Sequence, residues 1–198
     1  SIPYFTSGVF WVIYAQIDVV FISLLVSEDG VGWYSAADRL FGTFLFIPTI
    51  FLTAVFPAMS RSYLQGASSM SALMGKSFDL LLLISVPMGL GLFAIANAVV
   101  VLLFGAEFAN SGPILAIFGI VLIFTYQNML LGQFLISSDR QNKVAIIMAV
   151  VTFATIPLDL IFIPLCRSLF NNGAIGGAIA FVITEVGMMI AMIRYLPA

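Results

Sequence analysis

The chain has 198 residues, of which 62% are hydrophobic and 8% charged, so it lacks the polar side chains that a water-soluble surface needs. Its net charge of −2 forms no acidic or basic run, which gives no sign of a nucleic-acid partner. There is no histidine and one cysteine, Cys166, which removes the commonest general base, the commonest metal ligand and any internal disulfide. We therefore predict an all-α, polytopic membrane helix bundle that is not an enzyme and has no metal site or cofactor.

Apolar stretches long enough to cross a bilayer recur along the chain, with short turn-like breaks between them. A transmembrane helix needs about 20 mostly apolar residues to cross a hydrocarbon core about 30 Å thick. Because each stretch meets that length, we expect about six spans, arranged as antiparallel hairpins in one lobe covering residues 1–198. The predicted spans are residues 5–26, 34–59, 77–103, 112–137, 143–165 and 174–195.

Charged residues outside the spans predict the orientation. Six spans return both termini to one side of the membrane, and cytoplasmic loops are enriched in Lys and Arg. The basic residues on the side of the termini are Arg61, Lys76, Arg140, Lys143 and Arg194. The other side receives Arg167, Glu28, Asp29 and Glu107. Both termini are therefore expected to be cytoplasmic, in the inner (plasma) membrane.

The first span carries a polar stripe at helical spacing. Ser7, Trp11, Tyr14 and Asp18 share one face, whereas Gln16 points to nearly the opposite face. Ionisable side chains are costly in hydrocarbon and normally face a bundle interior or a water-filled cavity. We therefore expect this face, with Asp18 near mid-membrane, to point away from lipid.

The second span carries a small and polar stripe along its whole length, with one fixed cation, Arg39. Two functions are open for Arg39: it binds an anion, or it pairs with Asp38 or extends to the headgroups. Pro48 is expected to bend this helix. The stripe consists of Ser35, Arg39, Gly42, Thr49, Thr53 and Ser60.

The last three spans also carry polar stripes. Each intramembrane carboxylate (Asp18, Asp159, Glu185) is either a structurally satisfied acid or a contact for a proton, sodium ion or substrate. Small residues that open the sixth span are expected to let helices approach closely. The stripes are Thr125, Asn128 and Gly132; Thr152, Thr155 and Asp159; and Gly173, Gly177, Ala180 and Thr184, with Glu185 beside the last. We expect the stripes to face a second bundle.

Short strings along the whole chain resemble the polysaccharide-biosynthesis flippases, the Wzx-type O-antigen and capsule exporters of the multidrug/oligosaccharidyl-lipid/polysaccharide superfamily. In chain order the strings are IDVVFIS (17–23), VGWYSAADRL (31–40), FIP (46–48), FPAMSR (56–61), LFGAEF (103–108), IP (163–164), GAIGGAIA (173–180) and TE (184–185). The motifs are similar to those of the family's second, C-terminal lobe. The resemblance implies a fragment of a transporter with about 12 to 14 helices, whose N-terminal six-helix lobe is a missing partner.

The same resemblance implies a substrate and candidate binding residues. The substrate would be an oligosaccharide linked to polyprenyl pyrophosphate, moved from the cytoplasmic to the outer leaflet among membrane lipids, with possible coupling to H⁺ or Na⁺. Arg39 matches the arginine that ends the family's Tyr-x-Ala-Ala-x-Arg run and is a candidate pyrophosphate contact; Tyr14, Ser35 and Asn128 are further candidates for substrate binding. Asp159 stands where many relatives have Asn, so its role is not inherited from the family.

Three other functions remain open. A cation-coupled multidrug antiporter or a lipid II flippase of the same superfamily is favoured by Asp18, Asp159 and Glu185. A membrane-embedded glycosyl- or phosphotransferase lacks support, because the sequence contains no histidine and no paired Asp-x-Asp motif. A structural or assembly subunit is disfavoured by polar stripes on at least four spans.

Overall fold

The computed structural model describes residues 2–196, with side chains described from residue 12 onward except at 15 and 67. All regular elements in this part of the chain are helices, which confirms the predicted all-α class. They are α1 (Ile2–Leu25), α2 (Glu28–Phe44), α3 (Phe46–Gln65), α4 (Ala67–Phe104), the 3-10 turn η1 (Ala106–Phe108), α5 (Ser111–Ser137), α6 (Gln141–Phe170) and α7 (Ala174–Arg194).

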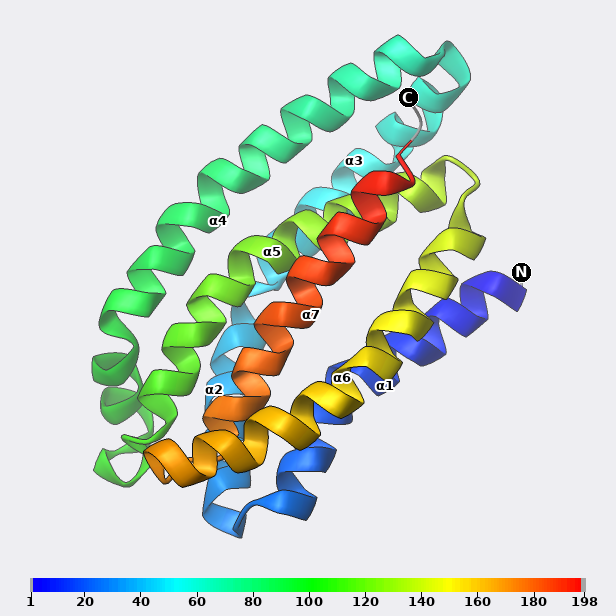
Figure 1. Ribbon diagram of the computed structural model, residues 1–198. Helices are drawn as coiled ribbons and strands as arrows, with labels where there is room; N and C mark the ends of the chain where they lie inside the picture. Colours follow the sequence, from blue (N-terminus) through cyan, green and yellow to red (C-terminus); the bar gives the residue numbers. More distant parts are fainter. Residues whose placement is uncertain (1, 197–198) are drawn as a thin grey trace.

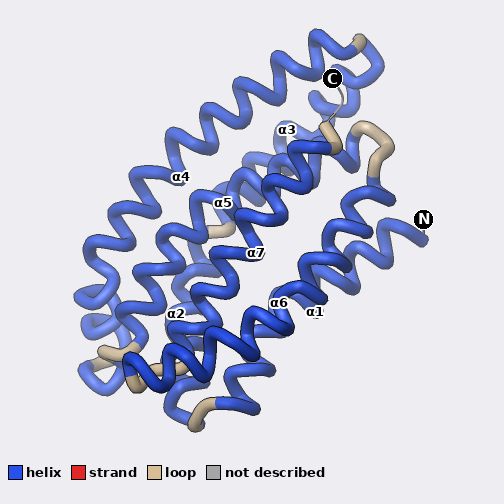
Figure 2. Tube along the Cα trace, viewed as in Figure 1, coloured by secondary structure: helices blue, strands red, loops and turns tan. Residues whose placement is uncertain are grey.

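Five helical stretches in the described part of the chain are long and apolar enough to cross a membrane. They are Glu28–Gln65, Ser68–Phe104, Ser111–Ser137, Gln141–Phe170 and Ala174–Arg194; α1 adds a shorter apolar segment, Val12–Leu25. Figures 1 and 2 show these helices side by side, with the connections at the two ends of the bundle. The chain is therefore a polytopic membrane helix bundle.

The second and third predicted spans lie inside helices that are longer than the predictions. The second span, predicted as 34–59, runs from Glu28 to Gln65 and is split into α2 and α3 at Leu45, because Pro48 has no N–H to continue the helical ladder. The third, predicted as 77–103, begins at Ala67, since Gly66 alone, at φ 115°, turns the chain. Polar residues in the first turns of a helix need no apolar surroundings, so hydropathy alone placed these ends too far inside.

Helix α5 lies at the centre of the bundle, between α4 and α7 (Figure 1), and most of its side chains are buried. Phe118 on α5 forms the middle of an aromatic cluster, with ring centroids 5.4 Å from Tyr34, 5.2 Å from Phe41 and 5.8 Å from Phe181. Edge and tilted ring pairs contribute about 0.5–1.5 kcal/mol each beyond area burial. The cluster therefore joins α2, α5 and α7 into one core.

Glycines allow some helix backbones to touch. A Cβ atom added to Gly119 of α5 would lie 2.9 Å from the backbone nitrogen of Phe93, and even closer to the Gly89 carbonyl, both on α4. Similarly, a Cβ on Gly173, just before α7, would lie 3.3 Å from the carbonyl oxygen of Ile163 on α6, and a Cβ on Gly176 would collide with the backbone of Phe162. The predicted close approach at the start of the sixth span is therefore confirmed, and α4 and α5 form a second such contact.

Side chains join the connections at each end of the bundle. At one end the Arg140 guanidinium donates a 2.6 Å hydrogen bond to the carbonyl of Tyr195, and the Lys143 ammonium lies 5.2 Å from the Tyr195 ring centroid. At the other end Arg167 donates to the carbonyl of Leu25, at 2.9 Å. Figure 1 shows the start of α1, the end of α7, the α3–α4 turn and the α5–α6 loop at the first of these ends.

Candidate functional site

The polar stripe predicted on the second span forms an exposed face along α2 and α3. Arg39, Gly42, Thr49 and Thr53 are exposed and Ser35 is half-buried. The Arg39 guanidinium would lose its hydration without compensation if it faced hydrocarbon. This face is therefore suited to water or to another protein surface rather than to lipid.

Arg39 lies at a pocket of about 220 Å³ on this face. Within the described residues its guanidinium has no hydrogen-bond or ion-pair partner, so it is not paired with Asp38. Ser35, one turn earlier on α2, lines the same pocket, and both residues were predicted to bind substrate. The other lining residues are Gly32, Ala36, Phe104 and Phe108. The pocket thus offers five N–H donors and one positive charge to an anion.

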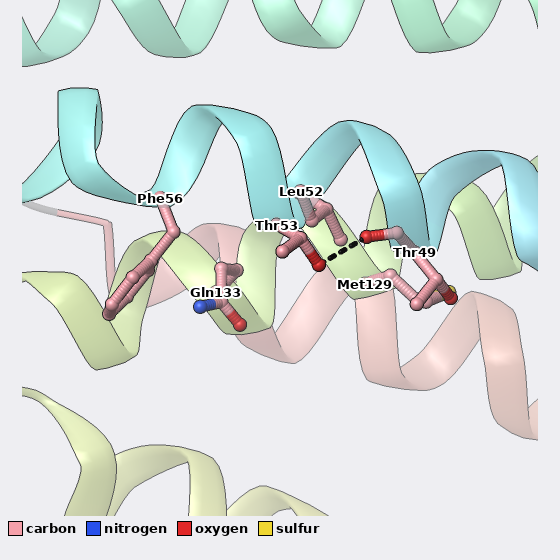
Figure 3. A pocket seen from close by; sticks show the side chains of 6 residues that line it. All are labelled: Thr49, Leu52, Thr53, Phe56, Met129 and Gln133. Atoms are coloured by element: carbon pink, nitrogen blue, oxygen red, sulfur yellow. Dashed lines mark hydrogen bonds between the residues drawn. The ribbon is translucent and has the colours of Figure 1, made fainter.

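A second pocket, of about 300 Å³, lies between α3 and α5 (Figure 3). The hydroxyl of Thr49 donates to the carbonyl of Leu45 at 2.7 Å, and that of Thr53 donates to the carbonyl of Thr49 at 2.8 Å. Their oxygen lone pairs remain as acceptors. The lining residues are Thr49, Leu52, Thr53, Phe56, Met129 and Gln133. Sequence reasoning missed Gln133, although a glutamine inside an apolar span was a visible signal.

Glu185 on α7 is the acceptor for a buried hydrogen-bond network. Tyr14 donates to its Oε1 at 3.1 Å, while Thr125 and Asn128 donate to its Oε2 at 3.0 and 2.8 Å. Asn128 also donates to the Glu185 backbone carbonyl at 2.9 Å, and Tyr14 shares a 3.1 Å hydrogen bond with Thr184. The carboxylate therefore holds α1, α5 and α7 together with three side-chain donors.

Two residues that were predicted to contact substrate, Tyr14 and Asn128, are instead members of this buried network. Tyr14 and Asn128 are buried around Glu185 and line neither the Arg39 pocket nor the α3–α5 pocket. On the first span Asp18 is also buried and Gln16 is exposed, as their spacing predicted. The side chains of Ser7 and Trp11, the other members of that stripe, lie outside the described residues.

Asp18 and Asp159 form a buried carboxyl pair between α1 and α6. Their carboxyl groups lie close enough to interact directly. Tyr34 donates to Asp18 Oδ2 at 3.0 Å, but Asp18 Oδ1 and both oxygens of Asp159 have no hydrogen-bond donor among the described residues. Thr152 and Thr155, which share the Asp159 stripe, donate instead to carbonyls of their own helix. This pair is therefore under-satisfied, in contrast to Glu185.

The expectation that the polar stripes face a second bundle is wrong for the last three spans and for the described part of the first, where Tyr14 and Asp18 are buried. Asn128, Asp159 and Glu185 are all buried inside this lobe, because α6 and α7 pack on α1, and α5, α6 and α7 pack on one another. The stripe on α2 and α3 is exposed. In the part of the chain that the structure describes, no three His, Cys, Asp or Glu side chains gather as a metal site would require.

The fold and these sites define a polytopic membrane protein with polar and charged groups at membrane depth, an arrangement typical of transporters. The sequence pattern of the family described as polysaccharide biosynthesis protein matches residues 1–113, more than half of the chain. The chain belongs to this family, which confirms the resemblance. Membership indicates a role in polysaccharide synthesis or export and, with the helical membrane bundle, fits a transporter rather than an enzyme.

The matched segment contains every residue that lines the Arg39 pocket, whereas Asp159 and Glu185 lie beyond it. No curated protein and no solved structure shows significant similarity to the chain.

Proposed function

We propose that this chain is part of a flippase that moves an oligosaccharide, carried on polyprenyl pyrophosphate, across the cytoplasmic membrane for surface polysaccharide synthesis. Family membership supports a role in polysaccharide synthesis or export. A pyrophosphate headgroup crosses hydrocarbon only if a cation and a polar groove replace its water. The flippase would supply both.

The observation that carries the proposal is the unpaired Arg39 guanidinium at its pocket on the exposed polar face. Guanidinium and phosphate oxygens form short, paired N–H···O bonds that a point charge does not reproduce. Ser35 adds a hydroxyl group to the same pocket. Arg39 and Ser35 would therefore bind the pyrophosphate during transfer.

The exposed polar face also suggests how the chain is used in a larger transporter. We propose that the chain is the second of two six-helix lobes, and that α2 and α3 face the N-terminal lobe across a water-filled cavity. Arg140 beside the α5–α6 loop and Arg194 at the end of α7 support a cytoplasmic position for that end of the bundle in the inner membrane.

The Asp18–Asp159 pair is our candidate for energy coupling. Two like charges at short range in an apolar interior repel strongly, so the pair needs a shared proton or a bound cation such as Na⁺. The unsatisfied oxygens of both residues supply acceptors for either ion. Glu185, whose oxygens already accept three side-chain donors, is assigned a structural role instead.

The experiment replaces Arg39 in the full-length protein and measures surface polysaccharide at matched protein level. Arg39→Ala is expected to abolish export, and Arg39→Lys to restore it only in part, because lysine lacks the planar pair of donors. The matched control is Arg61→Ala, since exposed Arg61 donates to its own helix, at the Pro57 carbonyl. Normal export by Arg39→Ala would refute the role of Arg39.

The carboxyl pair also favours a second candidate, a cation-coupled multidrug antiporter or lipid II flippase of the same superfamily. An antiporter would lower drug susceptibility when expressed, and Asp159→Asn would remove that effect. A lipid II flippase would instead rescue cells depleted of their own lipid II flippase. A chain that restores surface polysaccharide but produces neither effect supports the first candidate.

A further inference from the structure

We propose that the pocket between α3 and α5 is a saccharide subsite, which binds sugar units of the cargo while Arg39 binds the pyrophosphate. This inference rests on the proposed function and assigns a second part of the substrate to a second place on the same exposed face. The residues that carry it are Thr49, Thr53 and Phe56 on α3, with Met129 and Gln133 on α5 (Figure 3).

The lining matches a neutral ligand rich in hydroxyl groups. None of the lining residues carries a formal charge, so the pocket has no cation to balance the charge of a phosphate. Thr49 and Thr53 have already donated their protons to backbone carbonyls, so each hydroxyl oxygen can only accept from a ligand. Gln133 adds two donors and one acceptor, and it has no hydrogen-bond partner within the described range.

The same pocket also has apolar walls. Phe56 and Met129 lie on either side of the polar groups, and Figure 3 shows Phe56 and Thr53 extending from α3 toward the side on which Gln133 lies. Sugar rings present C–H faces as well as hydroxyl edges, so a mixed surface of this kind suits both. Its volume of about 300 Å³ falls at the lower end of the range for small-molecule pockets, about 300–1,000 Å³.

The position of the pocket relative to Arg39 suits a single extended cargo. At about 1.5 Å per residue, the helical path from Arg39 to Thr49 and Thr53 covers about 15–21 Å. All three residues are on the exposed face of α2 and α3. A lipid-linked oligosaccharide whose pyrophosphate lies at Arg39 would therefore place sugars several units away at the second pocket.

The test uses cysteine labelling in the full-length protein, reconstituted in liposomes with its native cysteines replaced. Thr53→Cys reports on the pocket, and Ala54→Cys is the matched control, because Ala54 is the next exposed residue of α3 and does not line the pocket. The probes are the repeat-unit oligosaccharide, released from the host's lipid intermediate and freed of phosphate, and inorganic pyrophosphate. The labelling reagent is a charged, water-soluble thiosulfonate.

We expect the oligosaccharide, at twice its Kd, to slow labelling of Thr53→Cys about threefold, because one third of the sites then remain free. Labelling of Ala54→Cys should not change, and pyrophosphate should slow labelling of Ser35→Cys but not of Thr53→Cys. Adding Gln133→Leu should weaken the protection of Thr53→Cys by the oligosaccharide.

Three outcomes would overturn the inference: no labelling of Thr53→Cys, no protection by the oligosaccharide, or equal protection by pyrophosphate. The first would mean that lipid or protein covers the pocket. If any of these occurs while export still requires Arg39, the saccharide subsite fails and the flippase proposal stands. If Arg39→Ala exports normally, the flippase proposal itself fails.

Discussion

The hydroxyl of Tyr126, on α5, donates a 2.7 Å hydrogen bond to the carbonyl oxygen of Phe44, the last residue of α2. In an unbroken helix that carbonyl would accept from the backbone N–H of residue 48, but Pro48 has none. A side chain from a neighbouring helix therefore supplies the bond that the proline removes. The break between α2 and α3 is thus stabilised by tertiary structure.

Tyr126→Phe should lower the free energy of unfolding by about 0.5–1.5 kcal/mol, because the Phe44 carbonyl loses its donor. In a Pro48→Ala background the loss should be smaller, since the backbone N–H that alanine restores at this position can then bond to Phe44 itself. A double-mutant cycle, measured by unfolding in detergent, gives the coupling between the two positions. Equal losses in both backgrounds would contradict this account; exposed Tyr63→Phe serves as the control.

Replacing the carboxyl group should change stability in opposite directions at Glu185 and at Asp159. Glu185→Met leaves Tyr14, Thr125 and Asn128 without their shared acceptor and should cost about 1–3 kcal/mol for each group that stays unsatisfied. Asp159→Asn removes a buried carboxyl group whose two oxygens have no donor among the described residues, so stability should stay level or rise, while transport is lost with the site for the proton or cation. Unfolding midpoints and export, measured together, check this contrast; a stable Glu185→Met variant would argue against it.

Gly119→Val should lower the free energy of unfolding by about 1–3 kcal/mol. A side chain at this position collides with the backbone of Gly89 and Phe93, and so separates α4 from α5. Gly91→Val is the matched control: Gly91 also lies inside a helix, but an added Cβ meets nothing within 4 Å. The control should be neutral or slightly stabilising, since valine favours helix more than glycine does. Similar thermal stabilities for the two variants would show that the close contact is unimportant.

Gln127→Leu should raise the free energy of unfolding by about 1–3 kcal/mol. Gln127 is 1% exposed, and neither polar atom of its amide has a hydrogen-bond partner among the residues that the structure describes. A buried amide without partners costs free energy that leucine, of similar size, avoids. Gln133→Leu on the same helix should change stability little, because Gln133 is partly exposed. A less stable Gln127→Leu protein would indicate a water-mediated bond at this site.

Helical spacing predicted which residues share a face of a helix. It did not predict which other helix, or which solvent, that face contacts. The separation of Gln16 from Asp18, and the shared pocket of Ser35 and Arg39, follow from one helix turn and were predictable. The contact between Tyr14 and Glu185 joins residues 171 positions apart, so it depends on how α1 packs against α7. For that reason the buried position of the last three stripes did not follow from the sequence.

The sequence also did not indicate which polar side chains within a span would lack a hydrogen-bond partner. Gln127 and Gln133 both interrupt the same apolar span, yet one is buried and the other lines a pocket. Only the orientation of α5 against its neighbours separates them. The break near Pro48 was predictable because proline acts through its own backbone, whereas the donor that completes it, Tyr126, lies 78 positions further along the chain.

The direct contact between the backbones of α4 and α5 at Gly89 and Gly119 has a mechanical consequence. Side-chain contacts can adjust by exchanging rotamers, but a contact made of backbone atoms has no rotamers to exchange. These two helices should therefore move as a single rigid body. Any rearrangement during a transport cycle would then occur elsewhere, at contacts such as the one between α1 and α6, where Asp18 Oδ1 and both carboxyl oxygens of Asp159 have no donor among the described residues.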